Sequence, residues 1–290
     1  TYSLSPETTG PTVVRPETRP PTSSKVATDK PAMAIAPFTE DKAKKHQQDW
    51  GDYLKTELTV SNSIGMQLRL IPPGEFQMGS PESEVGRFDN ETQHRVQITK
   101  PFYLSVHEVT QEQYERVMGE NPSRDKGATK PVEKVSWNDA VEFCRKLSAE
   151  EGVEYRLPTE AEWEYDCRAG TTTAYSFGDD ASRLGQYAWY SGNSDYITHT
   201  GGEKLPNPWG LYDIHGYLWE WCTDHGHDSY AGAPNDGSSW SDKGDRTKRI
   251  LRGGSWKDKP VKLTSSYRRV ADKDLRDDAV GLRCVLTTGK

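Results

Sequence analysis

The sequence predicts an α+β fold with long ordered loops, formed by one large domain that follows a Pro-rich segment. Three observations lead to this prediction: marked helix starts lie before Gly170, helical periodicity ends beyond it, and all nine tryptophans lie at or beyond Trp50. Because only 33% of the residues are hydrophobic, the core must rely on large aromatic side chains. The length of 290 residues suits either two small domains or one large domain with a tail, and the composition favours the second.

The N-terminal part divides into two segments. Residues 1–37 hold seven of the 18 prolines and a single aromatic residue, Tyr2, so they cannot bury enough surface to offset their ordering entropy. We interpret them as a disordered Pro/Thr-rich linker or stalk. Residues 38–60 should form an amphipathic helical lead-in, because Trp50, Tyr53 and Leu54 recur among charged residues. Residues 61–290 then form the folded domain.

The first strands follow the lead-in. A strand is expected over residues 66–71, ended by the turn sequence Pro72, Pro73 and Gly74. Its hairpin partner is expected over residues 94–99, and a further strand over residues 102–106.

Three helices have well-marked starts. Each start places a hydroxyl residue at the N-cap and a polar acceptor three residues later, as a capping box requires. The pairs are Thr110 with Gln113, Ser136 with Asp139, and Thr159 with Glu162. Gly119 and Gly152 are natural ends of the first two helices. Beyond Gly170 we expect irregular loops around a few short strands.

Charge and hydropathy exclude several classes of partner. The net charge is −7 and no run of Lys or Arg could follow a phosphate backbone, so we expect no nucleic-acid partner. No apolar stretch of about 18 residues is present, so we expect no membrane-spanning helix. The sequence shows no signal peptide and starts at Thr1, which is typical of a processed product.

Four sequence blocks occur in a characteristic order. Residues 71–80 read IPPGEFQMGS, residues 135–140 read VSWNDA, residues 156–165 read RLPTEAEWEY, and residues 209–222 read WGLYDIHGYLWEWC. With RGGSW at 252–256 and GLRC at 281–284, they resemble the formylglycine-generating enzymes, or sulfatase-modifying factors. The resemblance covers about four-fifths of the chain and implies their loop-rich C-type-lectin-like fold.

The chain departs from this family at the catalytic position. The enzymes hold copper(I) through two cysteines that follow the residue matching Ser255, and soft thiolates select this ion. Here the corresponding positions are Asp258 and, near the second, Leu263, and no cysteine lies between Cys222 and Cys284. Oxidation of cysteine to an aldehyde by the family's mechanism is therefore not expected.

The resemblance also implies a calcium site. The ligands would be the side chains of Asp213 and Glu220 with the carbonyls of Gly216 and Leu218, a set of hard oxygen donors. The alternative is that Asp213 caps a turn and Glu220 pairs with an arginine.

The four cysteines, Cys144, Cys167, Cys222 and Cys284, suit either disulfides or buried free thiols. The resemblance implies a disulfide between Cys144 and Cys284, and with it export to an extracytoplasmic compartment, periplasmic or secreted. The N-terminal stalk could tether the domain there.

A second metal candidate follows Cys222. Asp224, His225, His227 and Asp228 lie within five residues, and the two histidines would share one side of an extended segment. The alternative is an ordinary solvated loop.

Two functional hypotheses remain. The first is a non-catalytic, calcium-stabilised module that binds a protein, peptide or glycan in the groove near Ser255. The second is an enzyme with altered oxidative or metal-dependent chemistry, using Ser255, Asp258, Arg268 or Arg269 in that pocket, or the histidine loop.

Overall fold

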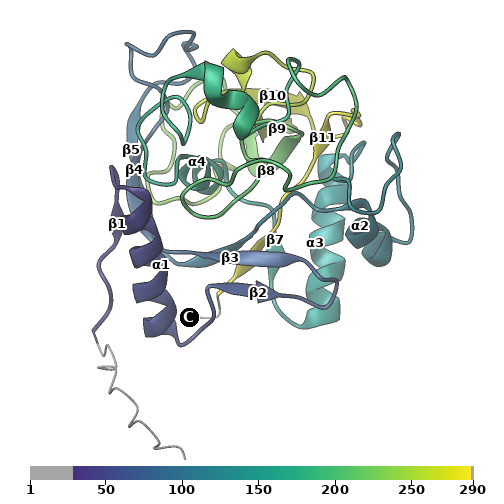
Figure 1. The fold of residues 1–290 in the computed structure, drawn as a ribbon, viewed down its shortest axis with the longest axis horizontal. Helices are drawn as coiled ribbons and strands as arrows, with labels where there is room; N and C mark the ends of the chain where they lie inside the picture. The colour runs from purple at the N-terminus through teal and green to yellow at the C-terminus, as the bar shows by residue number, and fades with distance from the viewer. Residues whose placement is uncertain (1–28, 289–290) are drawn as a thin grey trace, which may run out of the picture.

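The computed structural model describes residues 29–288, so most of the predicted linker, residues 1–28, lies outside the described residues. Within these residues the fold combines three sheets with four α-helices and two short 3-10 helices (Figure 1). The α-helices are α1 Glu40–Leu54, α2 Gln111–Met118, α3 Trp137–Glu151 and α4 Glu160–Arg168, and the 3-10 helices are η1 Ala181–Gln186 and η2 Pro260–Lys262. The prediction of an α+β, loop-rich architecture is confirmed.

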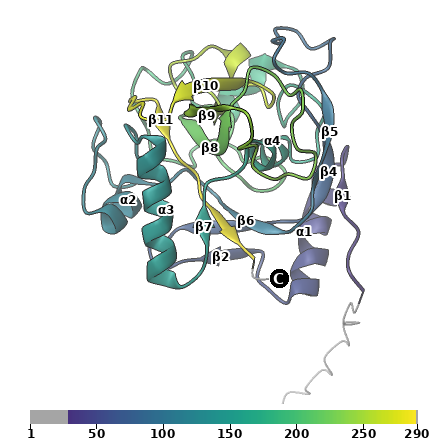
Figure 2. The same ribbon diagram turned by 180° about the vertical axis from the view of Figure 1, so that it is seen from behind.

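The central sheet has five strands in the order β2-β3-β6-β12-β7. They are β2 Thr59–Ser61, β3 Gln67–Ile71, β6 Phe102–Ser105, β12 Val285–Thr287 and β7 Tyr155–Arg156. All pairs are antiparallel. Helix α1 lies at one side of this sheet and α2 and α3 lie at the other (Figures 1 and 2).

A second sheet joins β1 Ala34–Ile35, β4 Gly74–Met78 and β5 His94–Ile98. It changes two expectations. The hairpin partner of β5 is β4, whereas β3 pairs with β6, because the Pro72-Pro73 turn leads directly into a new strand at Gly74. In addition, residues 34–35 of the predicted linker pair in parallel with β4.

The third sheet, in the order β10-β9-β8-β11, lies in the upper half of the molecule in Figure 1. Its strands are β10 Arg268–Asp272, β9 Asp245–Arg252, β8 Trp219–Gly226 and β11 Val280–Gly281. These strands carry the segments that the sequence singles out, since β8 follows the 213–218 bend and β9 ends at the RGGSW block.

The helix starts form as predicted. Thr110, Ser136 and Thr159 each accept a hydrogen bond from the backbone three residues on, and each box is reciprocal. Gly119 and Gly152 end α2 and α3 in the left-handed region, where glycine is favoured.

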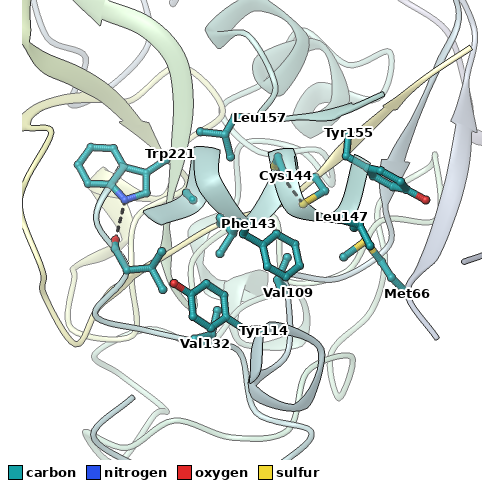
Figure 3. Close-up of a cluster of buried hydrophobic side chains, with 14 of the residues drawn as sticks. Met66, Val109, Tyr114, Val132, Phe143, Cys144, Leu147, Tyr155, Leu157 and Trp221 are labelled. Carbon is teal, nitrogen blue, oxygen red and sulfur yellow. Dashed lines mark hydrogen bonds between the residues drawn. The ribbon is translucent and has the colours of Figure 1, made fainter. Parts of the chain in front are cut away.

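The core is rich in aromatic residues. Six tryptophans are almost fully buried: Trp50, Trp163, Trp209, Trp219, Trp221 and Trp256. In Figure 3, Phe143 of α3 stacks on Tyr114 of α2 with 5.5 Å between ring centroids, and the indole of Trp221 donates to the Val135 carbonyl. Among the described residues, no helix is both long and apolar enough to cross a membrane.

Candidate functional site

Ser255 and Asp258 form a closed hydrogen-bonded pair after β9. The Ser255 hydroxyl donates to Asp258 Oδ2 at 2.6 Å, and the indole N–H of Trp219 donates to the same oxygen at 2.9 Å. The Lys262 ammonium lies 3.0 Å from Oδ1. Ser255 is only 1% exposed, so its hydroxyl cannot reach a ligand from solvent. The carboxylate is satisfied entirely from within the chain.

The position predicted for the second copper-binding cysteine is apolar. Leu263 is fully buried and packs with Tyr175 and Leu184. Neither Asp258 nor Leu263 supplies the soft ligand that copper(I) prefers.

The two arginines of the predicted pocket point to opposite sides of β10. Arg269 lies over the indole of Trp219, with its guanidinium carbon 5.5 Å from the ring centroid, and so stays near Asp258. Arg268 turns the other way and binds Glu160 through two bonds of 2.8 Å. Because neighbouring residues of a strand face opposite sides, the prediction that Arg268 belongs to the pocket is wrong.

The 213–220 bend has a strained backbone around Gly216. Asp213 and Tyr217 adopt φ of 57° and 84°, which is uncommon for residues other than glycine. Gly216 has φ of 100°, and a Cβ there would lie 2.8 Å from the Trp189 carbonyl oxygen. The bend therefore needs glycine at this position.

The two predicted carboxylate ligands differ in their freedom to bind a cation. Asp213 is 1% exposed; its Oδ2 accepts from the Gly202 N–H at 2.6 Å, whereas its Oδ1 is buried without a hydrogen-bond partner. Both oxygens of Glu220 are taken, by Arg283 at 2.9–3.1 Å and by the Trp163 indole at 2.7 Å. The orphaned Asp213 oxygen fits a hard cation, while the ion pair of Glu220 competes with one.

Sequence reasoning missed a third carboxylate at this bend. Glu108 is buried and accepts from the Leu218 N–H at 2.9 Å. Burial raises the pKa of the Glu108 carboxyl well above its ordinary value, and the carboxylates of Glu220 and Asp213 add to this effect. Nothing local in the sequence marks Glu108, because it reaches the bend from the segment between β6 and α2.

The predicted histidine cluster does not assemble into a metal site. The ring of His227 stacks on Trp240 with 3.5 Å between centroids, and Asp224 accepts N–H bonds from Trp240 and Glu160. His225 Nδ1 and His227 Nε2 have no hydrogen-bond partner. Within residues 29–288, no group of three or more His, Cys, Asp or Glu residues could hold a metal ion.

A buried Cys-His pair, also missed by the sequence reasoning, lies against Leu263 and Ser265. Cys167 Sγ is 3.6 Å from His215 Nδ1, and both residues are buried. Burial lowers the pKa of His215 to about 4 and raises the pKa of Cys167 to about 12. The pair is therefore a neutral imidazole and a thiol at pH 7, which is the opposite of an activated nucleophile.

Cys144 and Cys284 lie together, as the predicted pairing requires. Their sulfur atoms are 3.8 Å apart, and Cys144 lies in the buried cluster of Figure 3. Both are free cysteines in this structure. The disulfide itself remains a prediction.

An open groove lies next to the Ser255 segment. It has a volume of about 700 Å³ and is formed by residues from the segments 81–86, 172–181 and 260–264. We call it the loop groove. Val85 and Val261 at its edge are 95% and 37% exposed. Sequence reasoning placed a groove near Ser255 but could not identify these walls, because they are far apart in the sequence.

A family model, the sulfatase-modifying factor enzyme 1-like domain, matches residues 59–288. The chain belongs to this family. Among solved structures, PvdO from Pseudomonas aeruginosa is similar to this sulfatase-modifying factor-like chain, with a TM-score of 0.74 and 31% identity over 79% of this chain and 98% of that one. The expected family and fold are thus confirmed.

Curated relatives of this sulfatase-modifying factor-like chain have differing activities. Chaperone protein LppX from Paenibacillus barcinonensis is 28% identical over 63% of this chain and 79% of that protein. The formylglycine-generating enzyme of Thermomonospora curvata is 31% identical over 43% of this chain and 44% of its own. The inactive Cα-formylglycine-generating enzyme 2 of Bos taurus is 30% identical over 55% of this chain and 51% of that protein. The chain therefore spans about half or less of the latter two proteins.

Proposed function

We propose that this protein is a non-catalytic binding module of the sulfatase-modifying factor family, and that it binds a protein, peptide or glycan in the loop groove. The observation that carries the proposal is the closed Ser255–Asp258 pair. A catalytic group must be free to exchange protons, electrons or ligands with a substrate. Asp258 is instead fixed by Ser255, Trp219 and Lys262.

The alternatives within the same pocket have less support. Arg268 is committed to Glu160, and the buried Cys167 thiol is not activated. Two relatives are named as a chaperone and as an inactive enzyme. They support the view that a protein with this fold can have a role other than oxidising a substrate cysteine. A fold alone does not decide function, so the proposal depends on the pocket.

Calcium binding and export are parts of the same proposal. The cation would be held by Asp213 and Glu220 with the carbonyls of Gly216 and Leu218, and it would stabilise the bend by binding the folded chain. Support comes from the unpartnered Asp213 Oδ1. Export rests on the expected Cys144–Cys284 disulfide, and tethering rests on the Pro-rich segment.

Oxygen consumption tests the central claim. With copper(I) and a sulfatase peptide containing cysteine, the purified protein should consume no oxygen above background and should bind no copper. The double variant Asp258→Cys with Leu263→Cys is the matched control, because it restores two thiols at the expected positions and should bind about one equivalent of copper(I). Oxygen uptake by the wild-type protein would refute the proposal.

Elemental analysis separates the module from the enzyme with altered chemistry. We expect calcium and no transition metal in the purified protein. Iron, copper or zinc near one equivalent, lost in both His225→Ala and His227→Ala, would favour the enzyme instead.

A further inference from the structure

Arg249 of β9 is a buried cation without an anionic partner. It is only 7% exposed, and no carboxylate of the described chain forms an ion pair with it. Its guanidinium lies over the Trp137 ring, with 4.1 Å between the guanidinium carbon and the ring centroid. Because burial of a charge is costly unless the charge is paired, this arginine indicates that a partner from outside the chain completes the site.

One edge of the Arg249 guanidinium has no hydrogen-bond partner. Both of its hydrogen bonds come from Nη1, which donates to the carbonyls of Arg246 and Lys248 at 3.0 and 2.8 Å. Nε is buried without a partner, and Nη2 donates to no group within residues 29–288. Nε and Nη2 lie on the same edge of the planar guanidinium and donate in parallel. This is the arrangement that binds two oxygens of a carboxylate or a phosphate.

The nearby acidic side chains are engaged with other groups. Asp224 accepts two backbone N–H bonds of 2.8 Å. Asp245 accepts from the N–H and the hydroxyl of Thr247 at 2.8 and 2.6 Å. Burial lowers the pKa of the Arg249 guanidinium below its ordinary value, and the two carboxylates offset this effect only in part. The surroundings of Arg249 therefore keep an excess of positive charge.

His225 adds a second unpartnered nitrogen. It is the cross-strand neighbour of Arg249 in the β8–β9 pair, so the two side chains lie on the same face of the sheet. Its Nδ1 is buried without a hydrogen-bond partner. Burial lowers the pKa of the His225 imidazole, and the charges of Arg249 and Arg246 lower it further. An anion bound beside Arg249 would offset this positive field.

We propose that Arg249, with His225 at its side, binds an oxyanionic group, a phosphate or a carboxylate, through its Nε–Nη2 edge. The Trp137 ring holds the plane of the guanidinium, so the edge is preorganised before the anion arrives. None of these three residues lines the loop groove. The oxyanion site is therefore separate from the proposed binding function and does not depend on it.

Inorganic phosphate, acetate and chloride, compared at equal ionic strength, test the site in the full chain. An anion that binds the folded protein raises its melting temperature by mass action. Phosphate or acetate should raise the melting temperature more than chloride, because a single spherical ion cannot accept in parallel from both donors. The more effective of the two oxyanions identifies the ligand chemistry, and calorimetric titration with it gives the affinity.

Matched variants separate the oxyanion site from general positive charge. Arg249→Lys keeps the charge but removes the two-donor edge, and it should weaken binding of the oxyanion by roughly tenfold, the loss expected for hydrogen bonds to a charged group. Lys248→Gln removes an exposed cation from the next position of β9, whose side chain faces the other side of the strand, and it should leave the affinity unchanged. His225→Gln should weaken binding by roughly two- to fivefold and serves as the second test if the Arg249 variant does not fold.

Two results would overturn the site. Equal responses of the wild-type protein to phosphate, acetate and chloride would mean that water alone satisfies the Nε edge. Oxyanion binding that persists in Arg249→Lys but is lost in Lys248→Gln would mean that the exposed charges of β9 attract the anion. Neither result bears on the oxygen and copper assays, which test the absence of catalysis.

Discussion

At Asp258 a single carboxylate engages three polar groups around it. Its partners are a hydroxyl, an indole and an ammonium group, and each would otherwise be available to a substrate. The close pairing with Ser255 could be anticipated, since the two residues are three apart after a glycine pair. The direction of Arg268 could not, because it depends on which side of β10 faces Glu160.

A single substitution at Asp213 tests whether this residue binds calcium. If calcium binds there, the wild-type melting temperature should be higher with calcium than with a chelator, by mass action. Asp213→Asn should remove that difference, because the amide keeps an oxygen but loses the charge on which hard-cation affinity depends.

Glu220→Gln serves as the comparison. It should lower the melting temperature under both conditions, because the buried Arg283 loses its charged partner, and it should also remove the calcium difference if Glu220 is a ligand. Equal wild-type melts with calcium and with chelator would lead us to withdraw the ligand set and keep the fold.

Asp166 of α4 is a buried carboxylate whose removal should stabilise the protein. Both its oxygens are buried without a hydrogen-bond partner, and burial, with Glu162 nearby, raises its pKa well above the ordinary value. Asp166→Ala should increase the free energy of unfolding at pH 7 by about 1–3 kcal/mol, the usual cost of an unsatisfied buried polar group.

The sign of the pH dependence follows from linkage. A carboxyl with a raised folded pKa binds more protons in the folded state, so its contribution to stability declines as pH rises above the ordinary value of about 3.9. The advantage of Asp166→Ala should therefore be smaller at pH 4 than at pH 7 in urea unfolding. Glu150→Ala, at an exposed position of α3, is the control, and equal gains in both variants would contradict the argument.

At the scale of elements, helices marked by local sequence signals were predicted better than strands and their pairing. Capping boxes and terminal glycines lie within one helical turn, so three helices could be located from a few residues each. Strand β4 was missed although its buried Phe76 and Met78 alternate with less buried residues, because the turn residues before it masked the pattern. Strand β8 was missed because its first four residues are buried, which removes the alternation that marks a strand.

Helix α3 and strand β12 provide the test of the predicted disulfide. In protein purified from an oxidising compartment, alkylation in denaturant without reductant should label only Cys167 and Cys222, and reduction should restore four reactive thiols. The Cys144–Cys284 bond would join residues 140 positions apart and stabilise the fold by roughly 4–5 kcal/mol in the chain-entropy model. Four labelled thiols before reduction would refute the bond and weaken the argument for export.

At the scale of the whole molecule, the binding surface depends on contacts that are distant in sequence. The walls of the loop groove come from three segments, 81–86, 172–181 and 260–264. The family resemblance predicted the overall fold and the neighbourhood of Ser255. It could not predict the acidic lining, because Glu84 and Asp179 are unremarkable until the loops carrying them come together.

The two described ends of the chain have a mechanical consequence. In Figure 1 the two ends of the described chain lie in the lower half, near α1 and the central sheet, while the β4–β5 loop and the segment before β10 lie in the upper half, and Figure 2 agrees. Tension applied between the ends is therefore borne by β1, α1 and β12. Strand β1 is held by its pairing with β4, and β12 by its pairing with β6. Helix α1 is held to the core by Gln47, which donates a hydrogen bond to the Leu70 carbonyl at 2.8 Å. The loop groove lies outside this load path, so pulling on either end should leave its shape unchanged.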